Sequence, residues 1–313
     1  MSKVLRIGTR DSQLAVWQAS LVKDLLLNLD IPSTLVYIKS EGDIDTVTPL
    51  YALGVQGIFT KTLDAALLNN RIDLAVHSMK DVPVQLADGT MQYAVLKRAS
   101  YKDILVYKNN PDFMNDPDGT AVIATSSIRR MAQWLNRYPN HLFENLRGNV
   151  NTRLKKVQEQ NWNGAIFAAA GLERIGLRPD NSLDLDWMLP APAQGAIMVA
   201  GRNNDADVVK ACQPLNDDDT ALCTKTERDF LQTLLGGCST PISAHAEISN
   251  GMIQFRGNIV SPDGKEKVEV RKSAPVKNGK SIGIEAAHQI LSDRGKEIMR
   301  LISKNDIPHH NEL

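Results

Sequence analysis

The stretch LLGGCSTPISAHAE, residues 234–247, places a cysteine where a ligand can approach its sulfur. Two glycines precede Cys238, and a Ser-Thr-Pro follows it. A buried structural cysteine usually has bulky apolar neighbours, so this pattern predicts an accessible thiol on a loop. Only the thiolate is a nucleophile, and the ordinary thiol pKa of about 8.5 leaves little of it at neutral pH unless positive charge lies nearby. A cysteine hydrolase would also need a partnered histidine, and nothing shows that His245 faces the sulfur.

Six arginines occupy equivalent places, each in or beside a loop that follows a predicted strand. In parallel α/β sheets such loops build the binding crevice, and helix N-termini there add N–H donors. A single arginine could equally pair with a surface acid, but six in this arrangement predict a cleft for a polyanion. Walker and G-x-G-x-x-G motifs are missing, which disfavours a nucleotide. The arginines are Arg10, Arg129, Arg130, Arg147, Arg153 and Arg174, with hydroxyl groups at Ser12, Thr125, Ser126 and Ser127.

The segment VHSMKDVP, residues 76–83, joins the end of a strand to an adjacent pair of opposite charges. Asp81 at a strand's carboxyl end would point into the crevice, where Lys80 keeps it ionised. Such a carboxylate can stabilise a cation or pass protons to a leaving amine. Taken alone, the octapeptide favours the simpler interpretation, a solvated surface pair. His77 is expected to be a packed strand histidine.

The elements that must position these residues follow a β-α-β-α-β rhythm, which predicts parallel sheets covered by helices. The rhythm runs to about residue 98, then restarts, which predicts two lobes with a cleft between them. The strand expected within 191–202 would return the chain to the first lobe. The expected strands are 4–10, 33–40, 73–78, 103–108, 121–125, 141–146 and 164–170, and the expected helices are 11–29, 59–72, 127–138 and 150–160.

The last third of the chain predicts a small α+β domain. A helix over 219–235 ends at a Gly-Gly pair, and three β-like runs follow, separated by the turn sequences SNG and SPDG. An amphipathic helix over 281–302 is expected to close the chain. We therefore expect three domains: a first lobe from 1–98 and 196–216, a second from 99–195, and a C-terminal domain from 217–313.

The amino-acid composition argues against several classes of protein. With 313 residues, 42% of them hydrophobic, and 36 basic against 36 acidic residues, the chain is globular with no net charge. That balance argues against a general nucleic-acid binder. We expect no secretory leader, no membrane span and no metal site. The three cysteines suggest reduced thiols in the cytoplasm, with Cys212 and Cys223 structural.

Taken together, the motifs resemble the hydroxymethylbilane synthase (porphobilinogen deaminase) family from end to end. The order and spacing of the matching segments make the resemblance specific. These segments are LRIGTRDSQLAVWQA, GIFTKTLDAALL, DLAVHSMKDVP, ATSSIRR, LRGNVNTRL, AAAGLERIG, PAPAQGAI and LLGGCSTPI.

The resemblance implies a fold, a cofactor and a reaction. The fold would be two lobes similar to periplasmic binding proteins plus a C-terminal domain with a three-stranded antiparallel sheet. Cys238 would carry a dipyrromethane cofactor through a thioether, as an anchor. Four porphobilinogen units would be added to that primer head to tail, each losing ammonia, before hydrolysis releases the linear tetrapyrrole hydroxymethylbilane. The enzyme would be a cytoplasmic monomer without nucleic-acid or membrane partners.

The resemblance also assigns roles to individual residues. Asp81 would be the catalytic carboxylate, hydrogen-bonding pyrrole N–H groups and stabilising the cation formed when the amine leaves. Residues holding the cofactor and growing chain would be Lys80, Thr125, Ser126, Ser127, Arg129, Arg130, Arg147 and Arg153. Residues on the incoming-substrate side would be Arg10, Ser12, Gln18, Phe59, Lys61, Arg174 and Gln194.

Three positions depart from the family's commoner pattern. Glu41 stands where a non-acidic residue is frequent, Gln56 where a lysine often sits, and Ala193 where glycine is usual. The first two fall in a segment that the family uses as a flap over its cleft.

Two alternatives remain beside this interpretation. A two-lobed small-anion binding module could share the fold without catalysis, although it would have no use for Asp81 and Cys238 together. A catalytically dead family member would lack reactive residues that are present here.

Overall fold

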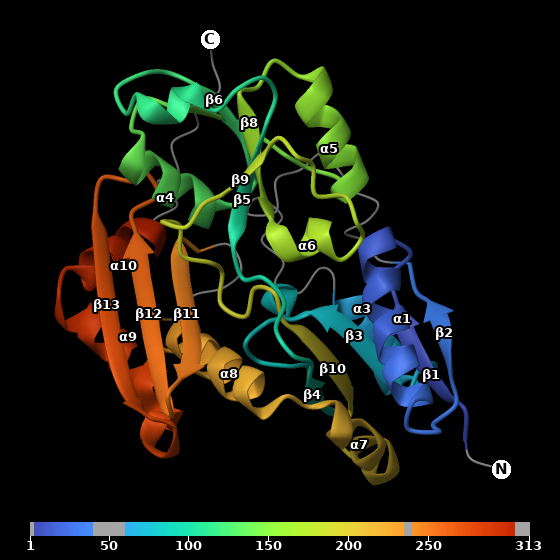
Figure 1. The fold of residues 1–313 in the computed structure, drawn as a ribbon. Helices are drawn as coiled ribbons and strands as arrows, with labels where there is room; N and C mark the ends of the chain where they lie inside the picture. Colours follow the sequence, from blue (N-terminus) through green and yellow to red (C-terminus); the bar gives the residue numbers. More distant parts are fainter. Residues whose placement is uncertain (1–2, 40–59, 235–239, 304–313) are drawn as a thin grey trace.

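The computed structural model describes residues 3–39, 60–234 and 240–303, which form three sheets with flanking helices (Figure 1). Two of the sheets have five strands each and the third has three. The mixed, parallel-rich α/β architecture expected from the β-α rhythm is confirmed, as is the antiparallel C-terminal sheet.

The first sheet has the strand order β2-β1-β3-β10-β4. Strands β1, β2 and β3 are parallel, whereas β10 is inserted antiparallel between β3 and β4. Thus the strand expected within 191–202 does lie beside strands from the N-terminal third. The strands are β1 (Leu5–Thr9), β2 (Ser33–Tyr37), β3 (Leu74–Ser78), β4 (Thr90–Val95) and β10 (Ile197–Arg202), and the helices are α1 (Gln13–Leu27), α3 (Lys61–Leu68) and α7 (Ala206–Cys212).

The second sheet repeats this plan with the order β7-β6-β8-β5-β9. Strands β6, β7 and β8 are parallel, and β5 runs antiparallel between β8 and β9. The strands are β5 (Asp103–Tyr107), β6 (Val122–Ala124), β7 (Leu142–Glu144), β8 (Gly164–Ala168) and β9 (Ser182–Asp184), and the helices are α4 (Ile128–Arg137), α5 (Val150–Glu159) and α6 (Ala169–Glu173).

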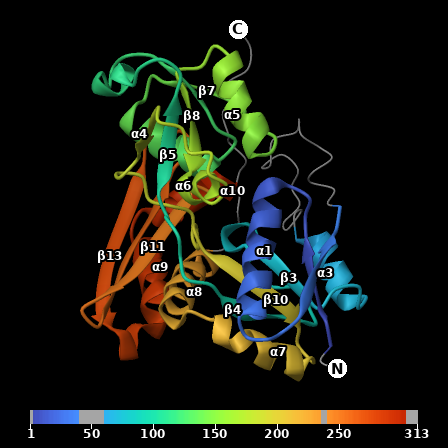
Figure 2. The same cartoon turned by 45° about the vertical axis from the view of Figure 1, so that its right-hand side comes forward.

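The third sheet is an antiparallel meander covered by helices. Its strands are β11 (Ile242–Ser249), β12 (Met252–Val260) and β13 (Lys267–Pro275), and its helices are α8 (Asp218–Thr233), α9 (Ile282–Ser292) and α10 (Gly295–Ser303). Helix α8 packs on β11 on one side and approaches β4 on the other, so it joins this sheet to the first one (Figures 1 and 2). Short 3-10 turns cover Met79–Asp81 (η1), Asp112–Asn115 (η2), Gln213–Leu215 (η3) and Val276–Ser281 (η4).

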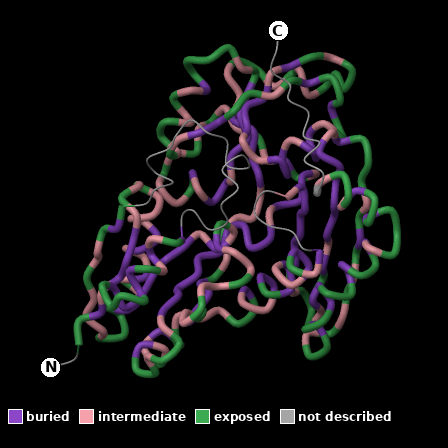
Figure 3. Tube along the Cα trace, turned by 180° about the vertical axis from the view of Figure 1, so that it is seen from behind, coloured by how far each residue is buried: buried purple, intermediate pink, exposed green. Residues whose placement is uncertain are grey.

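Buried segments follow the strands of each sheet, while exposed residues gather on loops and outer helix faces (Figure 3). Short polar side chains cap some of the helices: Ser12 accepts from the Ala15 N–H and Asp217 from the Thr220 N–H, each satisfying a donor that the helix leaves open. None of the helices within the described ranges is long and apolar enough to cross a membrane.

The expected single C-terminal helix is wrong, because the chain breaks between α9 and α10. Asp293 is extended there, and Gly295 approaches the end of α9 so closely that a Cβ on it would lie 2.3 Å from the Ile290 carbonyl oxygen. The apolar periodicity continues through this break, which is why it predicted one helix. Strands β4 and β9 and helices α6 and α7 were not among the expected elements.

Candidate active site

The predicted cations gather at one edge of the two five-stranded sheets, where parallel strands end. Arg10 follows β1, η1 with Lys80 and Asp81 follows β3, and the Ser127 cap of α4 comes shortly after β6. Strand β5 runs the other way, and its first residue, Asp103, pairs with Ala168 at the end of β8. The sheet topology therefore brings a carboxylate to the edge that carries the arginines.

Asp103 binds the two consecutive arginines of α4. Its Oδ2 accepts from Arg129 Nη2 at 2.7 Å, and its Oδ1 accepts from Arg130 Nη2 at 2.7 Å and Nε at 3.1 Å. All three side chains are buried. Burial alone would raise the Asp103 pKa, but the neighbouring cations outweigh it and hold that pKa well below its ordinary value. Asp103 therefore stays ionised and fixes both guanidinium groups.

Lys80 lies close enough to Asp103, Arg129 and Arg130 for their charges to affect its pKa. Its Nζ donates to Gln194 Oε1 at 3.2 Å. The Lys80 pKa is lowered to about 8, mainly by burial and in part by the charges of Arg130 and Arg129. The carboxylates of Asp81 and Asp103 oppose that shift. Lys80 thus remains mostly protonated at neutral pH, beside two further positive charges.

Arg153, at the first turn of α5, completes the group. Burial lowers its pKa to about 10, and the charges of Arg130 and Arg147 act in the same direction. Asp81 opposes the shift, while Arg10 adds to it. Asp81, whose side chain is exposed, therefore lies within electrostatic range of Lys80 and Arg153.

We name Lys80, Arg129, Arg130, Arg147 and Arg153 the cation cluster. Among the described residues, the carboxylates of Asp81 and Asp103 act on these cations. Burial of positive charge is costly, so an anionic ligand that adds negative charge here is expected to stabilise the cluster. The chemistry of its donors, mostly guanidinium groups, suits carboxylates in particular.

The predicted hydroxyl residues build the loops that carry the cluster. Ser127 caps α4 by accepting from the Arg130 N–H, and the buried Thr125 hydroxyl accepts from the Ser127 N–H at 3.2 Å. Ser126 Oγ donates to the Leu146 carbonyl at 2.8 Å, which ties this loop to the one containing Arg147. Ser12 caps α1.

Two glutamines predicted to lie in the site are buried, and their side chains hydrogen-bond to other residues of the site. Gln18 exchanges hydrogen bonds with Ser78 Oγ, directly before η1, at 2.9 and 3.3 Å. Gln194 donates to Asp103 Oδ1 at 3.0 Å and to the Tyr101 carbonyl at 2.8 Å, in addition to accepting from Lys80. Gln194 therefore holds two charged residues of the site in place, whereas Gln18 holds the serine that precedes η1.

The remaining predicted residues differ in how the structure places them. Arg174 lies over the Trp17 ring, 5.8 Å from its centroid, and donates to the Gly195 carbonyl at 2.7 Å. Burial lowers its pKa to about 10. Lys61 is exposed at the first position of α3. Phe59 and Cys238 lie outside the described residues.

The surroundings of Cys212, Cys223, His77 and His245 hold these side chains in their neutral forms. Burial raises the pKa of both Cys212 and Cys223 to about 12, in line with the structural role expected for them. Burial and the charge of Arg10 lower the His77 pKa to about 4, and burial lowers the His245 pKa to about 3, with Arg98 and Arg256 adding to the effect. Neutral imidazoles packed in this way fit the expectation for His77.

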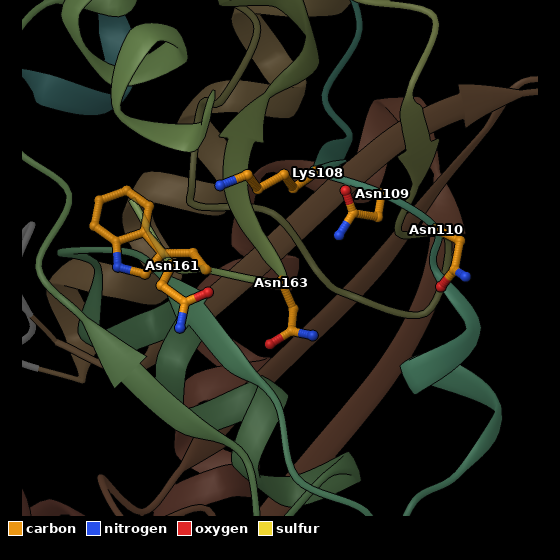
Figure 4. A pocket seen from close by; sticks show the side chains of 6 residues that line it. Lys108, Asn109, Asn110, Asn161 and Asn163 are labelled. Carbon is orange, nitrogen blue, oxygen red and sulfur yellow. The ribbon is translucent and has the colours of Figure 1, made fainter. Parts of the chain in front are cut away.

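A cavity of about 240 Å³ lies at the other end of β5, away from Asp103 (Figure 4). Its lining is Lys108, Asn109, Asn110, Asn161, Trp162 and Asn163. Most of these side chains are exposed, and Lys108 already donates to the Gln160 carbonyl. This cavity shares no residue with the cation cluster.

Comparison with known proteins shows the family to which the chain belongs. Residues 5–210 match the family described as porphobilinogen deaminase, dipyromethane cofactor binding domain, and residues 221–292 match porphobilinogen deaminase, C-terminal domain. The chain belongs to the porphobilinogen deaminase family. The porphobilinogen deaminase of Syntrophotalea carbinolica is 39% identical over 98% of this chain and 97% of its own length. That of Pelobacter propionicus is 39% identical over 97% and 98%.

Among solved structures, the periplasmic VFT2 domain of Bordetella pertussis BvgS covers 70% of this chain at 12% identity, with a TM-score of 0.42. The methionine binding protein MetQ covers 67% at 13% identity, with a TM-score of 0.42.

The dipyrromethane group of the porphobilinogen deaminase family fits the donor set. Each pyrrole ring carries an acetate and a propionate, and the cation cluster provides the matching positive charge. Of the family departures, Ala193 has φ 62, a left-handed conformation that favours glycine. Glu41 and Gln56 lie outside the described residues.

Sequence reasoning missed four residues that hold this site together: Asp103, Arg98, Glu227 and Arg228. Asp103 gave a usable signal, since it is a lone acid at the start of an otherwise apolar strand, DILVY. Arg98, Glu227 and Arg228 carried no such signal in the sequence, because their hydrogen-bond partners are more than 90 residues away in the chain.

Proposed function

We propose that this chain is a hydroxymethylbilane synthase. It joins four porphobilinogen molecules head to tail, releasing ammonia at each addition, and then releases the linear tetrapyrrole hydroxymethylbilane by hydrolysis. This proposal is supported by the family match over nearly the whole chain, together with the buried contacts that hold Arg129, Arg130 and Lys80 near Asp103 and Gln194. When bound, the dipyrromethane group supplies the primer to which the units are joined.

Charged residues of the site bind the substrate and cofactor, and uncharged residues hold those charged residues in position. The cation cluster binds the acetate and propionate groups, each charged hydrogen bond contributing roughly 1.5–3 kcal/mol. The incoming porphobilinogen is bound by Arg10, Ser12, Phe59, Lys61 and Arg174. Gln18 and Gln194 keep Ser78, Lys80 and Asp103 in place. Thr125, Ser126 and Ser127 shape the loop that presents Arg129 and Arg130.

Asp81 acts at the reacting carbon of the substrate. Its carboxylate accepts hydrogen bonds from pyrrole N–H groups and assists departure of the amine. It then stabilises the positive charge that develops on the substrate as ammonia leaves. A negative charge that the fold already holds beside the developing cation lowers the barrier to its formation. Cys238 anchors the dipyrromethane group and takes no part in hydrolysis.

The domain division and the setting belong to the same proposal. Residues 1–98 and 196–216 would form the first lobe, 99–195 the second and 217–313 the C-terminal domain, a division supported by the place of β10 between β3 and β4. We propose a monomer in the cytoplasm, in keeping with the free thiols of Cys212 and Cys223.

Purified protein incubated with porphobilinogen is expected to release four molecules of ammonia for each tetrapyrrole formed. Ammonia and the tetrapyrrole would be quantified in the same samples over time. Binding of porphobilinogen without ammonia release would instead indicate the two-lobed binding module and would overturn the synthase assignment.

A further inference from the structure

An arginine from a distant part of the chain donates hydrogen bonds to the backbone of the turn that carries Asp81. Arg228 of α8 donates from Nη1 to the Val82 carbonyl at 2.9 Å and to the Met79 carbonyl at 3.5 Å. Its Nη2 donates to the Pro83 carbonyl at 2.6 Å. One guanidinium group therefore binds backbone oxygens on both sides of Asp81.

The turn is also held by its own contacts, because the Met79 and Val82 side chains are buried in a core cluster with Ala196 and Met198. Within η1 the Val82 N–H donates to the Met79 carbonyl at 3.1 Å, and the Met79 N–H donates to the Ala196 carbonyl at 3.0 Å. The Asp81 side chain itself is exposed, so its direction follows from the backbone of the turn and not from packing of the carboxylate. A planar fork that spans several carbonyls fixes backbone geometry in a way that a single ammonium cannot.

Helix α8 is a rigid support for this fork. The residue before Arg228, Glu227, is fully buried and accepts hydrogen bonds from the Arg98 side chain and from the Ala193 and Ala246 N–H groups. Phe230, two residues further on, is buried in the C-terminal core. Because α8 is held on both sides, Arg228 transmits its fixed position to the turn.

We propose that Arg228 is a positioning residue for Asp81. It sets the carboxylate at its working distance from the substrate through the backbone of residues 79–83, without touching the substrate itself. This inference rests on the proposed function, because the role of Asp81 does. The competing possibility is that Arg228 merely ties α8 to the first sheet, in which case its removal would cost stability and leave turnover in the folded fraction unchanged.

The test compares Arg228→Met and Arg228→Lys with Lys225→Met in the full-length protein carrying its cofactor. Lys225 lies on the same helix and is exposed, and within the described part of the chain it pairs with Asp229, one turn further along α8. Intact mass checks that each variant retains the cofactor. We expect Arg228→Met to lower kcat about 10²-fold, the cost of a misplacement near 1 Å, with KM within about threefold of wild type. Arg228→Lys should recover only part of that loss.

Hydrogen exchange without substrate gives a second readout. Amides of residues 79–83 should exchange faster in Arg228→Met and at the wild-type rate in Lys225→Met. A wild-type kcat or unchanged exchange in cofactor-bearing Arg228→Met would overturn the positioning role alone. A wild-type protein that releases no ammonia would overturn the proposed function, and the positioning role for that reaction with it.

Discussion

The Asp81→Asn variant is expected to fold normally and to lose about 10³-fold in kcat. Asparagine has nearly the same size but no charge, so it cannot stabilise the cation that forms when ammonia leaves. Because the Asp81 side chain is exposed, its replacement should cost little stability. The rate of ammonia release at saturating porphobilinogen measures the effect.

Asp88→Asn is the matched control for this variant. Asp88 is also exposed and lies in the same connection between η1 and β4. We expect it to keep the wild-type rate, while Asp81→Glu, which keeps the charge but moves it, should fall between the two. Near-normal turnover by Asp81→Asn would remove Asp81 from the mechanism.

The Glu227→Gln variant is expected to lose about 3–5 kcal/mol of unfolding free energy, the usual cost of breaking a buried ion pair. Glu227 is fully buried and binds Arg98 Nη1 at 2.6 Å and Nη2 at 3.1 Å. It also accepts from the Ala193 and Ala246 N–H groups, at 2.6 and 2.7 Å. A glutamine leaves the Arg98 charge without a counter-ion and turns an amide donor toward another donor.

Urea unfolding of Glu227→Gln beside Glu269→Gln measures this loss. Glu269 pairs with Lys267 and Arg271 on the more exposed face of β13, where an ion pair contributes at most about 1 kcal/mol. Equal stability of the two variants would contradict the importance of the buried pair. Its loss would matter for function too, since the pair links the segment after β4, the Ala193 loop and α8.

Local patterns predicted much of the fold because they depend on neighbouring residues. The turn sequences SNG and SPDG were expected to separate the strands of the C-terminal domain, and β12 does begin and end between them. The break at Asp293 was not predictable in this way, since it depends on how Gly295 packs against the Ile290 carbonyl. Strand β9 is three residues long and carries no periodic pattern.

The site was predictable where motifs carry it and not where contacts across the chain build it. The order of strand ends indicated that Arg10, Arg129 and Arg153 would share an edge. The hydrogen bonds from Arg228 to the turn that carries Asp81 join residues 145 or more positions apart in the chain, so they become visible only in the folded structure. Gln18 was expected at the substrate, whereas the structure has it bonded to Ser78.

The central claim is that this chain builds tetrapyrroles on a group anchored to Cys238, and the most direct test is mass spectrometry of the intact and digested protein. The prediction is excess mass equal to two linked pyrrole rings, located on the peptide that contains Cys238. The Cys238→Ala variant should carry no such mass, and the peptides of Cys212 and Cys223 should be unmodified. A Cys238 that stays unmodified after incubation with porphobilinogen, or an adduct on another residue, would contradict the account.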